Sequence, residues 1–330
     1  MLRLRQILIG IVMVGLPVLS GLGRTLYVAP GGTNNPPYTN WADAATNIAW
    51  AVSVATNGET VWISNGVYIL TNAVSVPSGV TLSGLSAIDR PIMDGISSTR
   101  RCFVCQKVTL ENLFITRGSN YSMGGAVYLG NGPSIIRNCI FSNNVVFGSD
   151  SSVSYGGALW VNNGTNLVER CLFIDNKSEQ QYGGAVGHNS IDTTMYSNCV
   201  FQNNSASKIG GALYGNGKTL IISCEFAGNV AQSGGAVAMY KKMENCLIRN
   251  NVASFGGGVE GMGGIISGCT IVSNTAIVSG GGITYWSDLY TNYVENSILY
   301  HNIHASIIQV EVITGIALPS SIPIAVLPLL

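Results

Sequence analysis

The chain has 330 residues, of which 41 are glycine, and only 10% of its residues are charged. Lys plus Arg and Asp plus Glu both total 16, so the formal net charge is zero. A typical soluble domain is about 25% charged and roughly 7% glycine. The balance excludes a basic nucleic-acid-binding surface and an acidic solvating tail, and it favours turns and stacked structure.

Residues 1–23 have the pattern of a signal peptide. Arg3 and Arg5 give a positive start, residues 7–19 are apolar, and small residues at 20, 21 and 23 offer cleavage positions. The alternative is an uncleaved membrane anchor, but the apolar run is shorter than the roughly 20 residues that a span needs. We therefore expect an exported protein whose mature chain starts near Arg24 and does not span a membrane.

The region 105–302 is built on two interleaved repeats. The first reads N-C-x-[FI]-x-x-N, with a degenerate copy at residues 112–118. Its alternation predicts a short strand. The outward column of this strand begins at Ile140 and includes Glu225 and Thr270, which belong in solvent, so the Cys and Phe columns should face the core.

The second repeat is G-G-[AG]-[VLI], which starts at Gly124 and recurs at intervals of 22 to 32 residues. We expect this Gly-Gly pair at one corner of each coil and the last Asn of the first repeat at another, because both residue types tolerate a left-handed backbone. Such short repeats bury an apolar face only by stacking on copies of themselves. The predicted fold is all-β, a right-handed, single-stranded parallel β-helix.

The repeated residues are assigned to architecture. The predicted buried ladders consist of Cys139, Cys171, Cys199, Cys224, Cys246 and Cys269, and of Asn144, Asn176, Asn204, Asn229, Asn251, Asn274 and Asn302. In-register side chains point alike rather than toward each other, so free thiols are favoured over disulfides. Cys102 and Cys105 lie outside the column, as a local disulfide or two unrelated thiols. No metal site is expected, because ligand spacing is missing, and no cofactor is expected.

The pairing of G-G-A-[ILV] with F-x-x-N resembles the repeat of the chlamydial polymorphic outer membrane proteins, most closely at 141–144, 173–176, 201–204 and 226–229. The resemblance implies a pectate-lyase-like β-helix that is secreted or lies on the bacterial outer-membrane surface, often adhesin-like. In that family a membrane β-barrel follows. Here residues 303–330 are an apolar tail with three prolines, which leaves a poor C-terminal cap, a truncation or a misread frame as alternatives.

Residues 24–104 resemble the capping region of extracellular β-helix proteins. L-Y-V-A-P-G-G from Leu26 looks like the first strand, and residues 41–52 have the spacing of a helix that would cap the open core. G-E-T-V-W-I-S-N-G-V-Y from Gly58 looks like the first full coil. Asp94 and Gly95 match the turn that is usual before the second or third coil.

Catalytic residues of the enzymes with this fold are not evident, so an enzyme is less favoured than a binding scaffold. No Asp-Asp pair exists, whereas glycosidases need paired carboxyls. A polysaccharide lyase or glycoside hydrolase stays open as the alternative if carboxyls far apart in sequence meet in one groove beside a base. The candidates for such a meeting are Asp175, Asp192, Glu169, Glu225 and Glu260. Gly187-His188 only half resembles a hydrolase G-H-G motif, and we expect His188 to be an ordinary exposed residue.

The outward position after G-G-A-[VL] suggests a binding strip. It holds Tyr128, Trp160 and Tyr214, with His188 beside them. Sugar rings and protein partners both favour such aromatic side chains. The simpler explanation is that outward aromatics merely suit strands. The sequence thus predicts a monomeric, non-catalytic, adhesin-like scaffold that binds extracellular polysaccharide or a host or cell-surface protein, and no nucleic acid.

Overall fold

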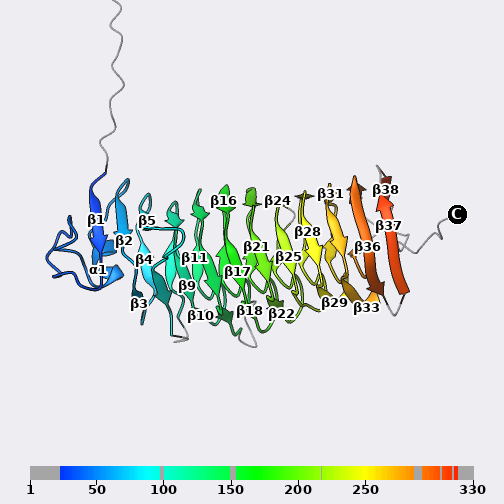
Figure 1. The fold of residues 1–330 in the computed structure, drawn as a ribbon, viewed down its shortest axis with the longest axis horizontal. Coiled ribbons are helices and arrows are strands. Elements are labelled where there is room, and N and C mark those ends of the chain that lie inside the picture. Colours follow the sequence, from blue (N-terminus) through cyan, green and yellow to red (C-terminus); the bar gives the residue numbers. More distant parts are fainter. Residues whose placement is uncertain are drawn as a thin grey trace, which may run out of the picture.

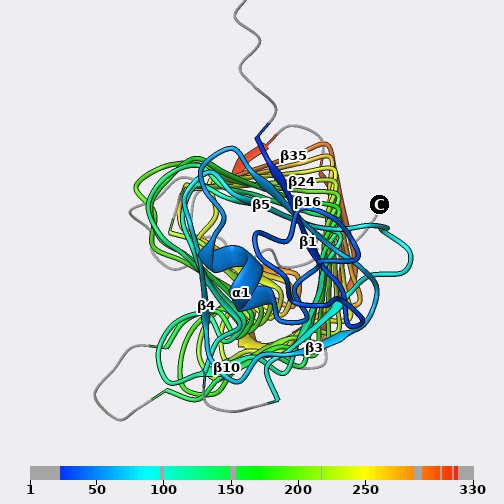
Figure 2. The ribbon, with the colours of Figure 1, turned by 90° about the vertical axis from the view of Figure 1, so that its left-hand side faces the viewer.

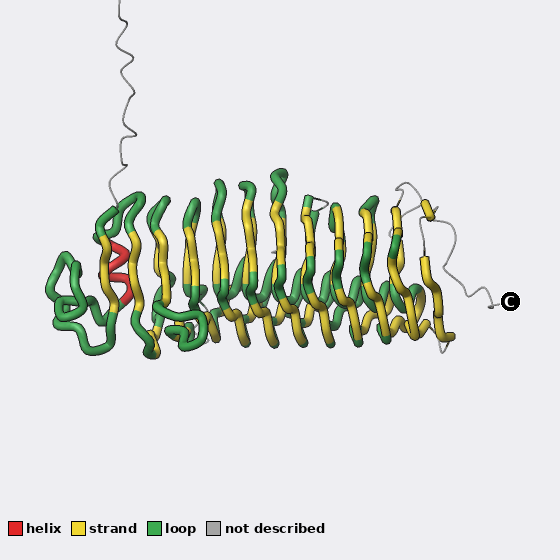
Figure 3. Tube along the Cα trace, turned by 45° about the horizontal axis from the view of Figure 1, so that its top comes forward, coloured by secondary structure: helices red, strands yellow, loops and turns green. Residues whose placement is uncertain are grey.

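The computed structural model describes residues 23–96, 100–148, 154–216, 218–285, 292–304, 307–313 and 316–318. Here the chain winds into a rod of stacked coils, seen side-on in Figure 1. Each central coil adds one strand to each of three long sheets, which we call C, A and B in chain order. From β1 to β36 the strands pair in parallel with the next coil, and Figure 3 shows them side by side along the rod, so the predicted β-helix is confirmed.

The strands of each sheet follow in stacking order. Sheet A contains β1 (Thr25–Val28), β2 (Thr60–Ile63), β5 (Thr81–Gly84), β8 (Thr109–Glu111), β12 (Ile135–Arg137), β16 (Asn166–Glu169), β20 (Thr194–Ser197), β24 (Thr219–Ile222), β27 (Lys242–Glu244), β31 (Ile265–Ser267), β35 (Asn292–Glu295) and β38 (Ile316–Leu318). Sheet B contains β3 (Val67–Ile69), β6 (Ile92–Asp94), β9 (Phe114–Thr116), β13 (Ile140–Ser142), β17 (Leu172–Ile174), β21 (Val200–Gln202), β25 (Glu225–Ala227), β28 (Leu247–Arg249), β32 (Thr270–Val272) and β36 (Ser297–His304), which β33 (Thr275–Ser279), β29 (Val252–Phe255) and β37 (Ile307–Ile313) extend. Sheet C contains β4 (Val74–Val76), β7 (Phe103–Cys105), β11 (Val127–Leu129), β15 (Leu159–Val161), β19 (Val186–His188), β23 (Leu213–Tyr214), β26 (Val237–Ala238), β30 (Val259–Gly261) and β34 (Ile283–Tyr285). A short sheet beside B contains β10 (Ser119–Asn120), β14 (Val145–Val146), β18 (Lys177–Ser178) and β22 (Ser205–Ala206).

Stacked identical side chains fill the core. The rings of Phe141, Phe173, Phe201 and Phe226 lie parallel, with successive centroids 4.6 to 4.8 Å apart. The Cys column turns into the same core, and its members are at most 3% exposed. All eight cysteines lie in the described part of the chain, and each is a buried free thiol. The burial of these two columns is what makes every coil depend on its neighbours.

The seven ladder asparagines are fully buried and hydrogen-bonded from coil to coil. Each Nδ2 from Asn144 to Asn274 donates to the Oδ1 of the next Asn at 2.9 to 3.0 Å and to a backbone carbonyl of the preceding coil. The left-handed residue is not the ladder Asn, as the sequence suggested, but the residue before it, for example Asn143 and Asn203 with φ of 54°. The side chain therefore makes the ladder while its neighbour makes the turn.

The N-terminal cap contains a shorter helix than residues 41–52 suggested. Helix α1 runs from Ile48 to Ser53, and the side chain of Asn47 caps it by accepting from the N–H of Ala49 at 2.8 Å. Ala45, just before it, bridges Val28 of β1, so that backbone is committed to strand pairing and cannot be helical. Figure 2 shows α1 lying across the open end of the coil stack. Its buried face covers apolar residues that would otherwise meet water.

The other end of the rod changes direction. Strand β37 pairs antiparallel with β36, and β38 pairs antiparallel with β35. Of the predicted apolar tail, the structure describes only parts up to residue 318, and of the predicted signal peptide only residue 23. Within the described ranges, no helix has the length and apolar character to span a membrane.

Candidate binding groove along sheet C

Two rows of side chains face each other along the outside of sheet C. One row is the outward position of the sheet C strands, where Tyr128, Trp160, Gly187, Tyr214, Ala238, Glu260 and Thr284 are paired in register. The other row is the residue before each Gly-Gly pair, where Met123, Tyr155, Tyr182, Ile209, Ser233 and Phe255 form parallel bridges. The repeat therefore sets two rows of side chains side by side along the rod, with one hollow beside Arg101 and another beside Glu260, and we call this strip the groove of sheet C.

The glycine between the rows makes this geometry possible. Gly156 has φ of +65°, and a Cβ there would lie 2.0 Å from the carbonyl oxygen of Leu159. A side chain is excluded both by the backbone conformation and by space. The sharp bend brings residue 155 back against the sheet beside residue 160.

Four aromatic side chains meet at this bend, and we call them the aromatic corner: Tyr155, Trp160, Tyr182 and Tyr214. The ring of Tyr155 lies 4.7 Å from that of Trp160 and 5.2 Å from that of Tyr182. Tyr182 and Tyr214 are stacked at 4.8 Å with 23° between their planes. Gly187 provides the room, because a Cβ there would lie 2.6 Å from the Cβ of Tyr155. Burial, with Tyr155, Tyr182 and Glu260 nearby, raises the pKa of Tyr214 to about 12.

Two members of the predicted binding strip are not on the surface. Trp160 is only 2% exposed because Tyr155 covers it. His188 is 1% exposed, so the expectation of an exposed histidine is wrong. It points inward from β19, its Nδ1 accepts from the N–H of Ser190 at 3.4 Å, and burial lowers its pKa to about 4, opposed by Asn216. A neutral core imidazole of this kind is not a ligand on the groove surface.

Tyr128 and Tyr214 remain half-buried members of the row, in different surroundings. The guanidinium of Arg101 lies 5.1 Å from the centre of the Tyr128 ring and donates to Oδ1 of Asn120 at 2.9 Å. A hollow of about 370 Å³ lies against Arg101, Arg100 and Asn120 at this end. The groove thus has a cationic end at the first coils and the aromatic corner further along.

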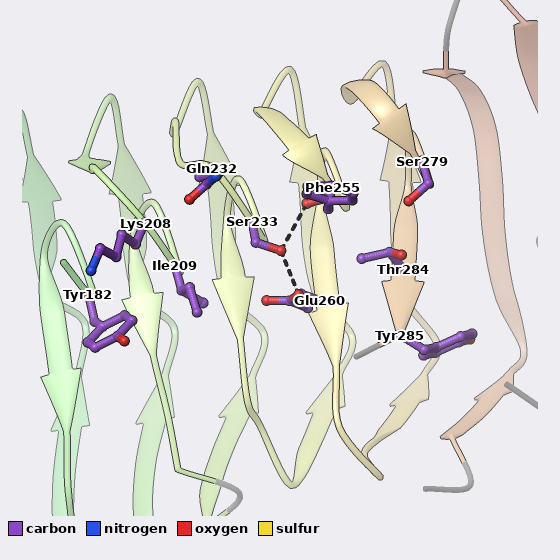
Figure 4. A pocket seen from close by; sticks show the side chains of 10 residues that line it. All are labelled: Tyr182, Lys208, Ile209, Gln232, Ser233, Phe255, Glu260, Ser279, Thr284 and Tyr285. Carbon is purple, nitrogen blue, oxygen red and sulfur yellow. Dashed lines mark hydrogen bonds between the residues drawn. The ribbon is translucent and has the colours of Figure 1, made fainter. Parts of the chain in front are cut away.

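Past the aromatic corner the groove deepens into a pocket of about 530 Å³, which we call the Glu260 pocket (Figure 4). Its lining is Tyr182, Lys208, Ile209, Gln232, Ser233, Phe255, Glu260, Ser279, Thr284 and Tyr285. Glu260 is 5% exposed, and its Oε1 accepts from the hydroxyl of Ser233 at 2.5 Å. Its Oε2 is buried with no hydrogen-bond partner among the described residues. Burial raises the pKa of Glu260, and the bond from Ser233 partly opposes this.

The five candidate carboxylates do not converge. Glu169 and Glu225 pair with Arg170 and Arg249 on sheets A and B. The carboxylate of Asp192 accepts from the N–H of Gly164, and Asp175 sits in a left-handed turn after β17. Glu260 is the one carboxylate among the described residues that line the pocket. The condition for paired carboxyls in one groove is not met there, and no group of three His, Cys, Asp or Glu that could hold a metal occurs in the described ranges.

Sequence reasoning missed Tyr155 and Tyr182. The signal was available, since both precede a Gly-Gly pair as Tyr-Gly-Gly. Both residues lie outside the strands whose alternation predicted the binding strip. Glu260 was one of the five candidate carboxylates, but its burial depends on Phe255 and Ser233 from the other row.

Residues 55–215 match the family model described as "Right handed beta helix region". The matched stretch runs from the end of the cap to the coil of β23, and with the parallel stacking it establishes the right-handed β-helix. The resemblance to the polymorphic outer membrane proteins rests on the repeat motif and stays a prediction.

Solved structures of other proteins align with most of the chain. A structure titled "Rhamnogalacturonan lyase" aligns with a TM-score of 0.49 at 14% identity, over 83% of this chain and 87% of that one. A pectin methylesterase from Aspergillus niger aligns with a TM-score of 0.46 at 14% identity, over 86% of both chains. Likeness at this level carries no conclusion about activity. No curated protein sequence matches the chain.

Proposed function

We propose that the protein binds a polysaccharide chain lying along the groove of sheet C and does not cleave it. The observation that carries the proposal is the aromatic corner, where Tyr155, Tyr182 and Tyr214 present partly exposed rings from neighbouring coils. Sugar rings pack their apolar faces on such rings while hydroxyl groups reach polar neighbours. One coil rises by about 4.8 Å, close to the length of one sugar unit, so successive sugars meet successive coils.

Polar side chains at the edge of the groove fit the same ligand. Lys208 and Gln232 are exposed beside the rings and offer hydrogen-bond donors. At the other end, the partly buried Arg101 and Asn120 line a second hollow. A polar margin around an apolar floor is the composition expected of a carbohydrate site.

The proposed place of action is outside the cell, in the medium or at a bacterial outer-membrane surface, as a monomeric, adhesin-like scaffold. The signal-peptide pattern of residues 1–23 and the repeat resemblance support it. A protein ligand of a host or cell surface is the competing occupant of the groove, because tyrosines also favour protein partners.

The test is glycan binding by single variants. Tyr182→Ala and Tyr214→Ala should each weaken the affinity for the polysaccharide that the wild type binds most tightly by roughly tenfold. This is the upper end of the range expected for the loss of one stacked ring. Tyr293→Ala removes an exposed tyrosine from sheet A and should leave affinity unchanged. Binding of a glycan that survives both groove variants, or binding only to a protein, would contradict the proposal.

A second candidate function is polysaccharide cleavage by a lyase or hydrolase of this fold. One observation favours it: Glu260 is a buried carboxyl with a raised pKa in a groove, as a general acid would be. Incubation with the bound polysaccharide separates the two functions. New reducing or unsaturated ends that disappear in Glu260→Gln would establish the enzyme and overturn the binding-only proposal.

A further inference from the structure

One oxygen of the Glu260 carboxylate has no hydrogen-bond partner among the described residues. Oε1 is satisfied by Ser233, whereas Oε2 is buried and has no hydrogen-bond donor among the described residues. A buried polar oxygen without a partner is unfavourable, and more so when it is ionised. The pocket in front of it is large enough for a sugar unit. A bound molecule that supplies a donor at this point would remove the deficit.

Lys208, the cationic side chain among the residues that line the pocket, is not that donor. Lys208 lies two coils before Glu260, because residues 209, 233 and 255 are successive members of one row. At about 4.8 Å for each coil, the separation along the rod is roughly 10 Å. Its side chain is exposed at the pocket edge, whereas Glu260 lies beneath Phe255 and Ser233.

Aromatic rings bound the same space. Phe255 is 39% exposed above Glu260, and Tyr182 and Tyr285 line the pocket on either side along the rod (Figure 4). Rings next to a carboxylate favour a cation that also has an apolar face, through cation–π attraction and packing. A uronic acid would instead bring a second carboxylate to Oε2, and like charges at close range repel.

From this we propose that the Glu260 pocket is a subsite for a sugar bearing a free protonated amine, whose ammonium group donates to Oε2 of Glu260 while its ring packs on Phe255. The inference rests on the proposed polysaccharide-binding function and narrows its ligand to amino-sugar-containing glycans. A charge-assisted hydrogen bond is about twice as strong as a neutral one, so the amine should decide the preference.

The experiment measures affinities for three oligosaccharides of equal length by calorimetry: glucosamine, N-acetylglucosamine and galacturonic acid hexamers. We expect the wild type to bind the glucosamine hexamer at least tenfold more tightly than the other two. Glu260→Gln should abolish that preference by lowering the affinity for the glucosamine hexamer. Glu225→Gln, a carboxylate paired with Arg249 on sheet B, is the matched control and should keep the preference.

The outcomes distinguish the two proposals. Equal binding of all three hexamers, or a preference for the uronate, overturns the amine subsite while the glycan-binding function stands. A preference that persists in Glu260→Gln also overturns it, because the carboxylate is then not the determinant. If the wild type binds none of the hexamers, the amine subsite is refuted, and if it binds no other glycan either, the proposed function falls with it. A thermal melt of each variant checks that the coil stack is intact.

Discussion

Replacing Asn204 by alanine tests how much the Asn ladder contributes to stability. The side chain of Asn204 makes four hydrogen bonds in the middle of the rod. Its Oδ1 accepts from the N–H and the Nδ2 of Asn176, both at 3.0 Å, and its Nδ2 donates to Phe173 O and Asn229 Oδ1, both at 3.0 Å. At about 1 kcal/mol net for each bond, Asn204→Ala should lower the free energy of unfolding by about 4 kcal/mol.

Two further variants sharpen this test. Asn204→Asp keeps an acceptor for Asn176, but its second carboxylate oxygen faces the oxygen atoms of Phe173 and Asn229. Because this places a negative charge beside two acceptors, the variant should lower the free energy of unfolding by at least as much as Asn204→Ala. Gln202→Ala changes an exposed side chain of the same coil and should stay within about 0.5 kcal/mol of the wild type. The assay is urea unfolding followed by circular dichroism. A loss below about 1.5 kcal/mol for Asn204→Ala would refute the additive treatment of the ladder.

Three other predictions concern the core. The pKa of His188 is about 4 when folded and about 6.5 when unfolded, so the unfolded chain binds the extra proton and stability falls as the pH drops through this window. Acidification from pH 8 to 4.5 should lower the free energy of unfolding by about 2.5 kcal/mol through this residue. Urea titrations at the two pH values should show that His188→Leu loses less stability on acidification, by that amount. Equal losses in the wild type and the variant would mean that His188 is not buried as a neutral ring. Gly184→Ala would place a Cβ 2.0 Å from the carbonyl oxygen of Gly211 and should abolish soluble expression. Gly31→Ala is the control, because a Cβ at Gly31 meets open space, and it should express normally. Equal yields of the two variants would contradict the close approach of the coils. Phe201→Ala empties a fully buried stacked position and should lower the free energy of unfolding by about 3–5 kcal/mol in the same urea assay, so that a loss under 1 kcal/mol would speak against the stack.

The sequence pattern did not predict the length of helix α1 or the position of the left-handed turn before each ladder Asn. The spacing of residues 41–52 is helical, yet only Ile48–Ser53 forms helix, because Ala45 pairs with β1 across the chain. The left-handed turn lies at the residue before each ladder Asn, a shift by one that spacing alone does not distinguish. In both cases a partner distant in sequence decided the local backbone.

The sequence pattern also did not predict which residues of the groove are accessible to a ligand. The sequence placed Tyr128, Trp160 and Tyr214 on one row, and they are in register. It could not show that Tyr155 covers Trp160, since that contact depends on the space left by Gly187 one coil further. It also assigned His188 to the surface, although strand alternation from Val186 would have turned it inward.

The sequence by itself determined the β-helix, because the same residue types return at the same positions and stacking is the one way for such short strands to bury their apolar faces. It also determined which columns are core, since alternation separates Phe201 and Cys199 from Val200. Only the tertiary structure decided which outward side chains are accessible and that Glu260 is a buried carboxylate in a pocket. Accessibility there is set by contacts between two rows separated by a Gly-Gly bend, and a repeat pattern does not specify contacts between non-repeated side chains.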